Sequence, residues 1–357
     1  MRPVVGGSFS CPHHPGETSQ GYKDTAMKHA RAGSTASVQV QEPFGTDVPV
    51  RRRNVLDHCV GVIVGRTVAD REARSGYLFT LPTLIYIVII FFIPAGYTVV
   101  LSLHRWSIRG FGEFVGLESY IELLGDPLFR KSLANTLAFT LLSVPATVCL
   151  GLATALAFQS RTRLPLRNLY KAAYFAPLVV SLVAVAFVWK WMFNPSIGLL
   201  NNILRSLNLP EQGWLNDPGQ VLPSLAIMYV WARLGFAMVI FVAGLESIPD
   251  DYYDAAAIDG AGRWQRFRHI TFPLLNPQLV LVIILEMITS LRTFDLPYIA
   301  AQGGPAHASR TVVLHIYDSA FQYLRMSTAA AAALVLFVLI LALTLIQRRV
   351  LSRKIEY

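Results

Sequence analysis

An apolar stretch of the sequence runs from Tyr77 to Leu103 and reads YLFTLPTLIYIVIIFFIPAGYTVVLSL. It contains no charged residue. About 20 apolar residues in a helix are enough to cross the hydrocarbon core of a bilayer. This stretch therefore predicts a membrane-spanning helix.

Five more stretches of similar character follow, separated by short polar connections: Leu133–Phe158, Tyr170–Phe193, Val221–Leu245, Pro277–Ala301 and Met326–Gln347. Lipid cannot satisfy open backbone groups, so helices are the economical way to cross it. The fold class predicted for residues 77–357 is an all-α membrane protein with six transmembrane helices. Bends are expected in several spans, at Pro94, Pro145, Pro177 and Pro297.

The composition fits this prediction and excludes other classes. Apolar residues make up 54% of the 357 residues and charged residues 15%, against about 25% charged in a soluble domain. The net charge is +9, and the charged residues lie between the apolar stretches. This arrangement favours the inner-leaflet surface of a membrane over nucleic acid as the partner of the positive charge. Three distant cysteines, Cys11, Cys59 and Cys149, provide neither a disulfide framework nor metal-ligand spacing.

Residues 1–76 differ from the rest of the chain. They are rich in Pro, Gly, Ser, Thr and charge, and they contain neither a spanning stretch nor a signal peptide. We expect a largely disordered cytoplasmic tail. An alternative is that the true start lies downstream, for example at Met27.

The positions of Lys and Arg predict the orientation. The connections 51–76, 159–169, 246–276 and 348–357 contain 16 Lys and Arg, and the connections 104–132, 194–220 and 302–325 contain 7. The first set is therefore expected in the cytoplasm, with both termini.

The predicted cytoplasmic loop 246–276, between spans four and five, contains start and stop signals for a short helix. Pro249 and the acids after it favour a helix start, and Gly260 favours a helix stop. Between them, Tyr253–Ile258 is predicted as a short helix with a small-sided surface at Ala255–Ala257. Such a surface allows another protein to pack closely against the helix. The alternative is that the helix is an ordinary amphipathic connection between two spans.

A second short helix is expected after Gly260. Its apolar side chains recur at spacings of three and four, in Trp264, Phe267, Ile270 and Thr271, with arginines around the other side. This pattern favours a helix that lies against the membrane surface. Pro273 is expected to end it.

This loop resembles the coupling loop of binding-protein-dependent ABC importer permeases. Here it reads Asp254-Ala-Ala-x-x-Asp259-Gly260-Ala261, then eight residues, then Ile270-x-x-Pro273. The family pattern is Glu-Ala-Ala-x-x-x-Gly, ending Ile-x-Leu-Pro, so Asp254 and Phe272 depart from it. The shorter Asp254 bears on the reach of the family's ion pair with its ATPase.

A second segment resembles the carbohydrate permeases of the maltose and glycerol-3-phosphate type. It comprises Phe294-Asp295, Gly303-Gly304-Pro305, Thr311, Ile316-Tyr317 and Ala320-Phe321. The resemblance covers about residues 77–357. It implies the type I ABC importer permease (MetI-like) fold, in the cytoplasmic membrane of a bacterium or archaeon.

The resemblance also implies the partners and the division of labour. A second, usually different, permease subunit completes the path, two ATPase subunits bind ATP and Mg, and an extracytoplasmic binding protein delivers the solute. The residues expected to couple to an ATPase are Asp254, Ala255, Ala256, Asp259, Gly260 and Ala261. The chain itself has no Gly-Lys-Ser/Thr phosphate loop, so we expect no cofactor and no catalytic residue of its own.

Polar groups inside spans are costly and mark functional sites. Span four has Tyr229, Arg233 and Phe236 on one face, and span five has Glu286, Thr289, Ser290 and Thr293 on one face. The resemblance assigns the family's sugar-lining positions to Tyr229, Ala232, Arg233, Phe236, Glu286, Thr289 and Ser290. The alternative is that Arg233 and Glu286 form a structural ion pair.

The function predicted is the permease subunit of an ATP-driven importer for a mono- or oligosaccharide. One alternative solute is glycerol 3-phosphate or a glycerophosphodiester, because Arg233 could meet a phosphate. An alternative of another class is a proton-coupled secondary transporter that uses Glu286 and Asp295. An enzyme is not supported, since no nucleophile–base constellation or metal cluster is present.

Overall fold

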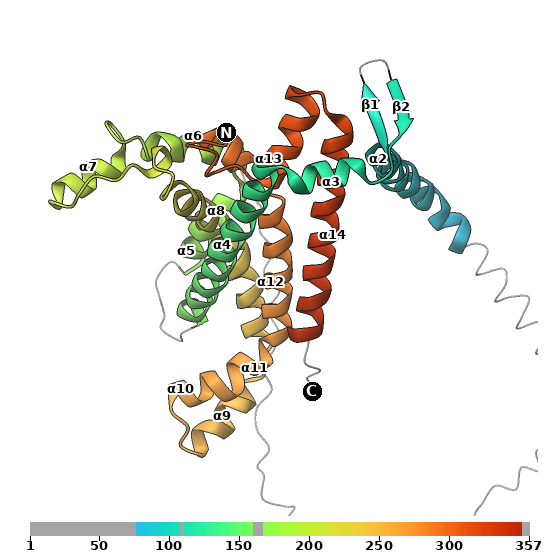
Figure 1. The fold of residues 1–357 in the computed structure, drawn as a ribbon. Helices are drawn as coiled ribbons and strands as arrows, with labels where there is room; N and C mark the ends of the chain where they lie inside the picture. The colour runs from blue at the N-terminus through green and yellow to red at the C-terminus, as the bar shows by residue number, and fades with distance from the viewer. Residues whose placement is uncertain (1–75, 108–109, 160–166, 352–357) are drawn as a thin grey trace, which may run out of the picture. The chain divides into compact units, whose positions relative to one another are not determined.

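The computed structural model describes residues 76–351 except 108–109 and 160–166. The predicted cytoplasmic tail up to residue 75 lies outside these residues. The described chain is mostly helical, as predicted, and belongs almost entirely to a compact unit that extends from Leu78 to the C-terminus (Figure 1).

Four helices of the described residues are long and apolar enough to cross a membrane. The first is Gly76–Ser102, which contains the π-helix η1 (Val88–Phe92) and α2 (Ile93–Ser102). The others are α4 (Pro127–Gln159), α8 (Val221–Glu246) and α14 (Met326–Leu351). Two bent helix pairs raise the number to six if each pair is one span.

Span three is one of these bent pairs. It consists of α5 (Arg167–Val179) and α6 (Leu182–Met192), whose axes differ by 112°. The bend follows Pro177, at Ser181, whose backbone is extended with ψ 134°. Pro145, in contrast, lies inside α4 and does not end that helix.

Span five differs from the prediction at its C-terminal end. The helix α12 (Asn276–Leu291) stops well before the predicted Ala301. The chain leaves the helix at Arg292, and a π-helix, η4 (Pro297–Ala301), follows. The polar residues Arg292, Thr293 and Asp295 mark this break in the sequence, but apolar residues resume at Leu296, and the prediction ran through it.

The second helix of the 246–276 loop ends at Leu274, one residue after Pro273 and so within a residue of the predicted end. The segments α10 (Arg263–Arg266), η3 (Phe267–Thr271) and α11 (Phe272–Leu274) follow one another without a gap. Pro273 lacks the N–H that would continue this helical path, and the path breaks just after it. The helical path then bends by 64° into α12.

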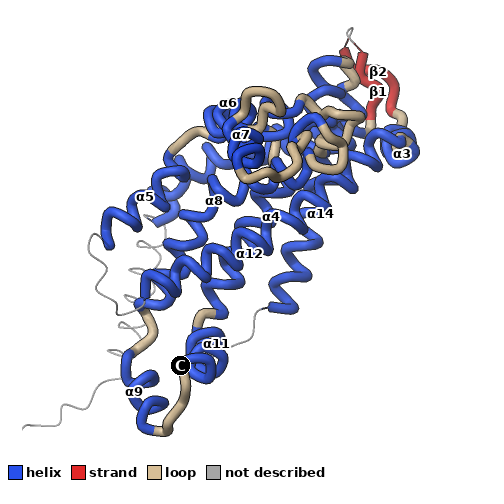
Figure 2. Tube along the Cα trace, turned by 90° about the vertical axis from the view of Figure 1, so that its left-hand side faces the viewer, coloured by secondary structure: helices blue, strands red, loops and turns tan. Residues whose placement is uncertain are grey.

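The helices α4, α8 and α12 form the centre of the bundle (Figure 2). Buried side chains such as Val148, Phe241 and Leu245 join them in one apolar cluster. The helix α5 packs closely on α8 at Gly235, where any Cβ would collide with the Tyr174 carbonyl oxygen. Burial of these apolar contacts orders the polar groups that project between α8 and α12.

Short elements occupy the two ends of the bundle (Figure 1). One end has the antiparallel hairpin β1 (His104–Ser107) and β2 (Gly110–Phe114), α3 (Glu118–Gly125), α7 (Leu199–Ser206), the 3-10 turn η2 (Trp214–Asn216), α13 (Val312–Tyr317) and η5 (Asp318–Gln322). The other end has α9 (Asp250–Ile258) and α10. The connections predicted to face outward therefore share one end, opposite the 246–276 loop.

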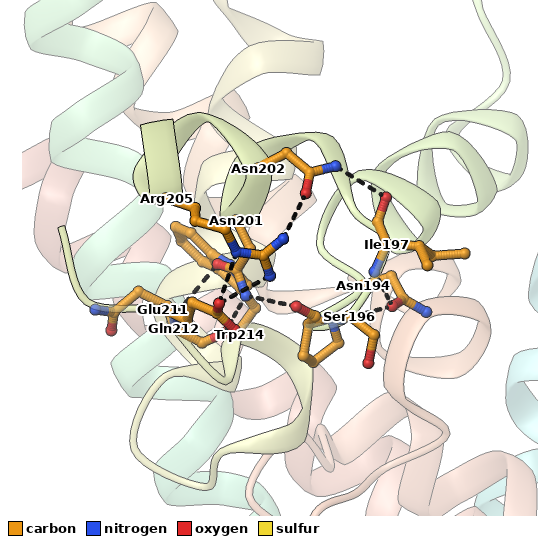
Figure 3. A network of polar contacts seen from close by, with 10 residues as sticks. Asn194, Ser196, Ile197, Asn201, Asn202, Arg205, Glu211, Gln212 and Trp214 are labelled. Carbon is orange, nitrogen blue, oxygen red and sulfur yellow. Dashed lines mark hydrogen bonds and ion pairs between the residues drawn. The ribbon is translucent and has the colours of Figure 1, made fainter. Parts of the chain in front are cut away.

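A buried asparagine fixes the connection between α6 and α8 (Figure 3). The Asn201 amide donates to the carbonyl oxygens of Pro195 and Gln212, at 3.0 and 2.9 Å. Its oxygen accepts from the Gln212 backbone N–H and from Trp214 Nε1, at 3.2 and 2.7 Å. All four capacities of the amide are used, so this loop has a defined conformation.

Candidate functional site

The predicted residues Tyr229, Arg233 and Glu286 form one polar cluster between α8 and α12. Arg233 Nη2 and Nε lie 2.8 and 3.1 Å from Glu286 Oε1. The Tyr229 hydroxyl donates to Glu286 Oε2 at 2.9 Å. Both carboxylate oxygens therefore have donors inside the chain, as a buried charge requires.

The cluster opens to its surroundings on one side only. Glu286 and Tyr229 are fully buried, whereas 18% of the Arg233 side chain is exposed. The Arg233 guanidinium also lies over the half-buried Phe236 ring, 4.6 Å from its centre. Among the described residues, Arg233 Nη1 makes no hydrogen bond, so this group is the polar donor that the cluster leaves available.

The remaining predicted path residues have partners within the bundle. Ala232 is buried. The Thr289 hydroxyl donates to the Leu285 carbonyl oxygen at 2.8 Å. The hydroxyl oxygen of the fully buried Ser290 lies 3.0 Å from the Met287 carbonyl oxygen and 3.1 Å from Thr140 Oγ1, and either can accept its one proton. Thr289 keeps some exposure, whereas Ser290 joins α12 to α4.

Thr140 is a residue that sequence reasoning missed. It lies on α4, where hydroxyl residues recur near helical spacing: Ser132, Thr136, Thr140, Ser143 and Thr147. Four of these hydroxyls bond the carbonyl oxygen four residues earlier, as such side chains do in membrane helices. This polar stripe was legible in span two and marks the face toward α12.

The helix α9 ends in a turn that its glycine makes possible. Gly260 has a φ of +74°, which glycine adopts without strain. The Ala261 N–H donates to the Ala256 carbonyl oxygen at 2.9 Å, and the Gly260 N–H donates to that of Ala257 at 3.1 Å. This is a Schellman motif, so the predicted helix stop at Gly260 is confirmed. The helix begins earlier than predicted, at Asp250.

The face predicted to couple to an ATPase is open in this chain. The side chains of Asp254, Ala255 and Asp259 are exposed, and α9 buries no residue. Gly260 is also exposed, whereas Ala256 and Ala261 are half-buried. A Cβ added to Gly260 would meet no atom of this chain within 4 Å.

This open helix is nevertheless held firmly at its base. The Tyr253 and Thr271 hydroxyls are hydrogen-bonded at 3.0 Å, and Thr271 is buried. Arg266 Nε donates to the Ala261 carbonyl oxygen at 2.8 Å. The turn after α9 is therefore tied to the helical segment that leads into α12.

The segment after span five folds around a second buried ion pair. Arg310 Nη2 lies 2.7 Å from Asp318 Oδ2, and both side chains are more than 90% buried. Asn135 of α4 donates to the carbonyl oxygens of His307 and Arg310, at 2.9 and 3.0 Å. Sequence periodicity could not predict this pairing, because Arg310 lies in an irregular loop and Asp318 begins η5.

The described residues contain no group of three or more His, Cys, Asp or Glu that could hold a metal ion. The polar chemistry of the chain therefore lies in the α8–α12 cluster, the α9 face and the Arg310–Asp318 pair.

A polar cluster between apolar spans and an open, anchored loop at one end define a multi-pass membrane transport subunit. The family model "Binding-protein-dependent transport system inner membrane component" matches residues 147–357, more than half of the chain, and the chain belongs to this family. It is the permease of a binding-protein-dependent ABC importer, a multi-pass inner-membrane transport component and not a catalytic enzyme. Permeases of this family bind no cofactor, and their ATPase partner handles ATP.

Individual relatives agree with this assignment. The chain is 36% identical over 285 residues to the trehalose/maltose transport system permease protein MalF of Thermococcus litoralis, covering 78% of this chain and 94% of the relative. It is 32% identical over 283 residues to the sn-glycerol-3-phosphate transport system permease protein UgpA of Agrobacterium fabrum, covering 79% and 96%. A bacterial alginate ABC transporter, solved with an alginate pentasaccharide-bound periplasmic protein, shares the fold with a TM-score of 0.71 at 23% identity, over 80% of this chain and 98% of that chain.

Proposed function

We propose that this permease translocates a neutral carbohydrate, a mono- or oligosaccharide, past the cluster of Tyr229, Arg233 and Glu286. The observation that carries the proposal is the ion pair itself. Arg233 is already neutralised by Glu286, so the cluster has no net charge to attract an anion. The available Arg233 Nη1 group and the Thr289 hydroxyl provide hydrogen bonds for the hydroxyl groups of a sugar.

The predicted path residues take these roles in the proposal. Phe236 walls one side of the solute, and Arg233, held over its ring, offers the polar contact. Glu286 orients Arg233, and Tyr229 holds Glu286. Ala232 and Ser290 shape the wall from the buried side, where Ser290 bonds Thr140.

Glycerol 3-phosphate or a glycerophosphodiester is the second candidate. One observation favours it: Arg233 keeps an unbonded donor, and guanidinium groups suit phosphate oxygens. The UgpA relative is named for this solute. A phosphate would, however, have to compete with the Glu286 carboxylate for the same guanidinium.

The two candidates separate in an uptake assay. The complete transporter, with its partner subunits and binding protein in proteoliposomes, is supplied with ATP and labelled maltose, trehalose or glycerol 3-phosphate. We expect ATP-dependent uptake of a sugar and none of glycerol 3-phosphate. Uptake of the phosphate alone would overturn the carbohydrate proposal in favour of the second candidate.

The same proposal includes the coupling surface. We infer that the open face of α9 docks in a groove of an ATPase subunit, with Asp254 toward a basic residue and with Ala255, Ala256, Asp259, Gly260 and Ala261 at the contact. The exposure of this face supports the inference. The Lys and Arg distribution supports a cytoplasmic location of this loop and of both termini.

The proposed assembly contains this chain, a second permease subunit, two ATPase subunits and an extracytoplasmic binding protein. The related alginate transporter was solved with a periplasmic protein, which supports the last of these partners. The binding protein would dock at the end of the bundle that presents β1, β2, α3 and α7.

A further inference from the structure

Four aromatic rings that the sequence places in two separate segments meet after span five. Phe294 and Tyr298 follow the end of α12, Tyr317 is the last residue of α13, and Phe321 lies in η5. The Phe294 and Tyr298 rings are stacked, 4.9 Å apart at 16°. Tyr317 lies 5.1 Å from Phe294, 5.3 Å from Tyr298 and 5.3 Å from Phe321. We call these four rings the aromatic ladder.

The ladder is not part of the packed interior. None of its rings belongs to the three clusters of buried apolar residues in the described chain. Phe294, Tyr298 and Tyr317 are half-buried, and Phe321 is 66% exposed. A large exposed ring that is supported from behind by another ring has a free face for a ligand.

The ladder also carries two hydroxyl groups. The Tyr298 and Tyr317 rings meet edge-on at 5.3 Å, and the nearby Tyr298 side chain, followed by burial and the charge of Asp318, raises the pKa of Tyr317. Asp318 is neutralised by Arg310, 2.7 Å away. The rings and their hydroxyl groups therefore stand beside no unpaired charge of this ion pair, which favours a neutral polar ligand over a phosphate.

The position of the ladder connects it with the proposed path. Phe294 is eight residues beyond Glu286 in the sequence and three beyond Leu291, the last residue of α12. Thr289 lies between them on α12, and the buried Thr293 lies in the break that follows. Tyr317 is the last residue of α13, and Figure 1 shows α13 at the end of the bundle opposite α9. A solute that enters from that end would reach the ladder before Arg233.

We propose that the aromatic ladder is a second carbohydrate subsite, at which a pyranose ring stacks on Phe321 and bonds the Tyr298 and Tyr317 hydroxyls before it moves to the Arg233–Glu286 cluster. This inference rests on the proposed function and deepens it. The apolar C–H face of a pyranose suits an aromatic ring, and its equatorial hydroxyls suit the tyrosines. A subsite outside the buried cluster would receive the sugar while the inner cluster is still closed.

The test compares Phe321→Ala with Phe321→Trp in the complete transporter in proteoliposomes. The measurements are the initial rate of ATP-dependent maltose and trehalose uptake against concentration, and the ATPase rate stimulated by the unliganded and loaded binding protein. We expect Phe321→Ala to raise the half-saturating sugar concentration about three- to tenfold, and Phe321→Trp to leave it within about twofold. Tyr317→Phe should show a smaller rise, because it keeps the ring and loses one hydroxyl.

Other results have definite meanings. Equal uptake curves for wild type and Phe321→Ala overturn the ladder and leave the proposed function intact. Loss of binding-protein stimulation without sugar in both Phe321 variants also overturns it, since the surface would then be a protein contact. No sugar uptake by the wild-type transporter contradicts the proposed function itself, and the ladder proposal fails with it.

Discussion

The polar residues of the α8–α12 cluster and those of α9 both lie on helices that are tied into the bundle, but only the first group is paired within the chain. Glu286 accepts hydrogen bonds from Arg233 and Tyr229 and is fully buried. Asp254 and Asp259 are exposed on a helix that buries nothing. The polar groups of the first region are hydrogen-bonded within the chain, whereas the acidic side chains of the second region are exposed at the surface of the chain.

This difference separates the surface proposed to meet the solute from the surface proposed to meet an ATPase. A buried ion pair must be satisfied internally, because an uncompensated charge in a membrane helix costs several kcal/mol. An exposed acid on a short alanine-rich helix stays hydrated, so it costs the fold little free energy. It contributes favourable free energy only when it binds a partner. Substitutions in the first region should therefore change the stability of the chain itself, and substitutions in the second should change coupling alone.

The largest effect is expected at the displayed region. Gly260→Arg places bulk and charge at the turn where α9 would enter a groove, so ATP-driven uptake should be abolished or fall by at least about a hundredfold. The measurement is uptake by the reconstituted transporter, with copurification of the ATPase subunits as the readout of assembly.

Gly260→Asn is the matched control, because asparagine tolerates the left-handed conformation at φ +74° without a long side chain. It should keep most of the uptake. If Asn and Arg were equally damaging, backbone strain would explain the loss and the docking surface would lose its support. Normal uptake with Gly260→Arg would contradict docking directly.

The next effect concerns the self-contained region. Arg233→Ala leaves Glu286 charged and unpaired, so the chain should lose about 3–5 kcal/mol of stability. The double variant Arg233→Met, Glu286→Gln removes both charges and should recover most of this loss. Thermal unfolding of the purified complex measures both variants.

Uptake by the same double variant distinguishes a purely structural Arg233–Glu286 pair from an Arg233 that contacts the solute. We expect uptake to stay at least about tenfold below wild type although stability returns, because the Arg233 donor is gone. Full recovery of uptake would show that the pair serves the bundle only.

A smaller effect is expected where the interior contains a titratable group without a partner. His315 of α13 is buried, and neither ring nitrogen has a hydrogen bond among the described residues. Burial, with the charge of Arg310 as a second cause, lowers the pKa of His315 to about 4. Between about pH 6.5 and 4 the histidine binds a proton in the unfolded chain and stays neutral in the folded chain. The free energy of unfolding therefore decreases as the pH is lowered through this range, by up to about 3 kcal/mol.

Melting temperatures at pH 7 and pH 5 test this expectation. His315→Phe keeps a ring beside Phe129, whose centre lies 5.5 Å from the histidine ring, and removes the titration. Its melting temperature should fall less between the two pH values than that of wild type. An unchanged pH dependence would assign the effect to other groups.

The sequence predicted the helical membrane fold because apolar stretches near span length leave few alternatives in lipid. It predicted the helix stop at Gly260 because that turn requires a local conformation which glycine favours. These features depend on composition or on a few neighbouring residues. The same is true of the small-sided face of α9.

Features that depend on contacts between distant parts of the chain were harder to predict from the sequence. Apolar residues resume at Leu296 after the polar residues Arg292, Thr293 and Asp295, so the prediction extended span five past the end of α12 at Leu291. The Arg233–Glu286 pair was one of two alternatives, since periodicity gives a face and not a distance. The Arg310–Asp318 pair belongs to packing between separate segments, which periodicity does not report, whereas Thr140 belongs to a hydroxyl stripe that the spacing along span two does report.

The bend between α11 and α12 has a mechanical consequence. From Arg263 to Leu291 the chain is helical except near Leu275, and Arg263–Leu274 forms an arm about 18 Å long. Tyr253 and Arg266 tie α9 to this arm through hydrogen bonds. If α9 docks on an ATPase as proposed, a displacement of α9 would be passed to this arm and would change either the 64° angle at Leu275 or the tilt of α12, which carries Glu286.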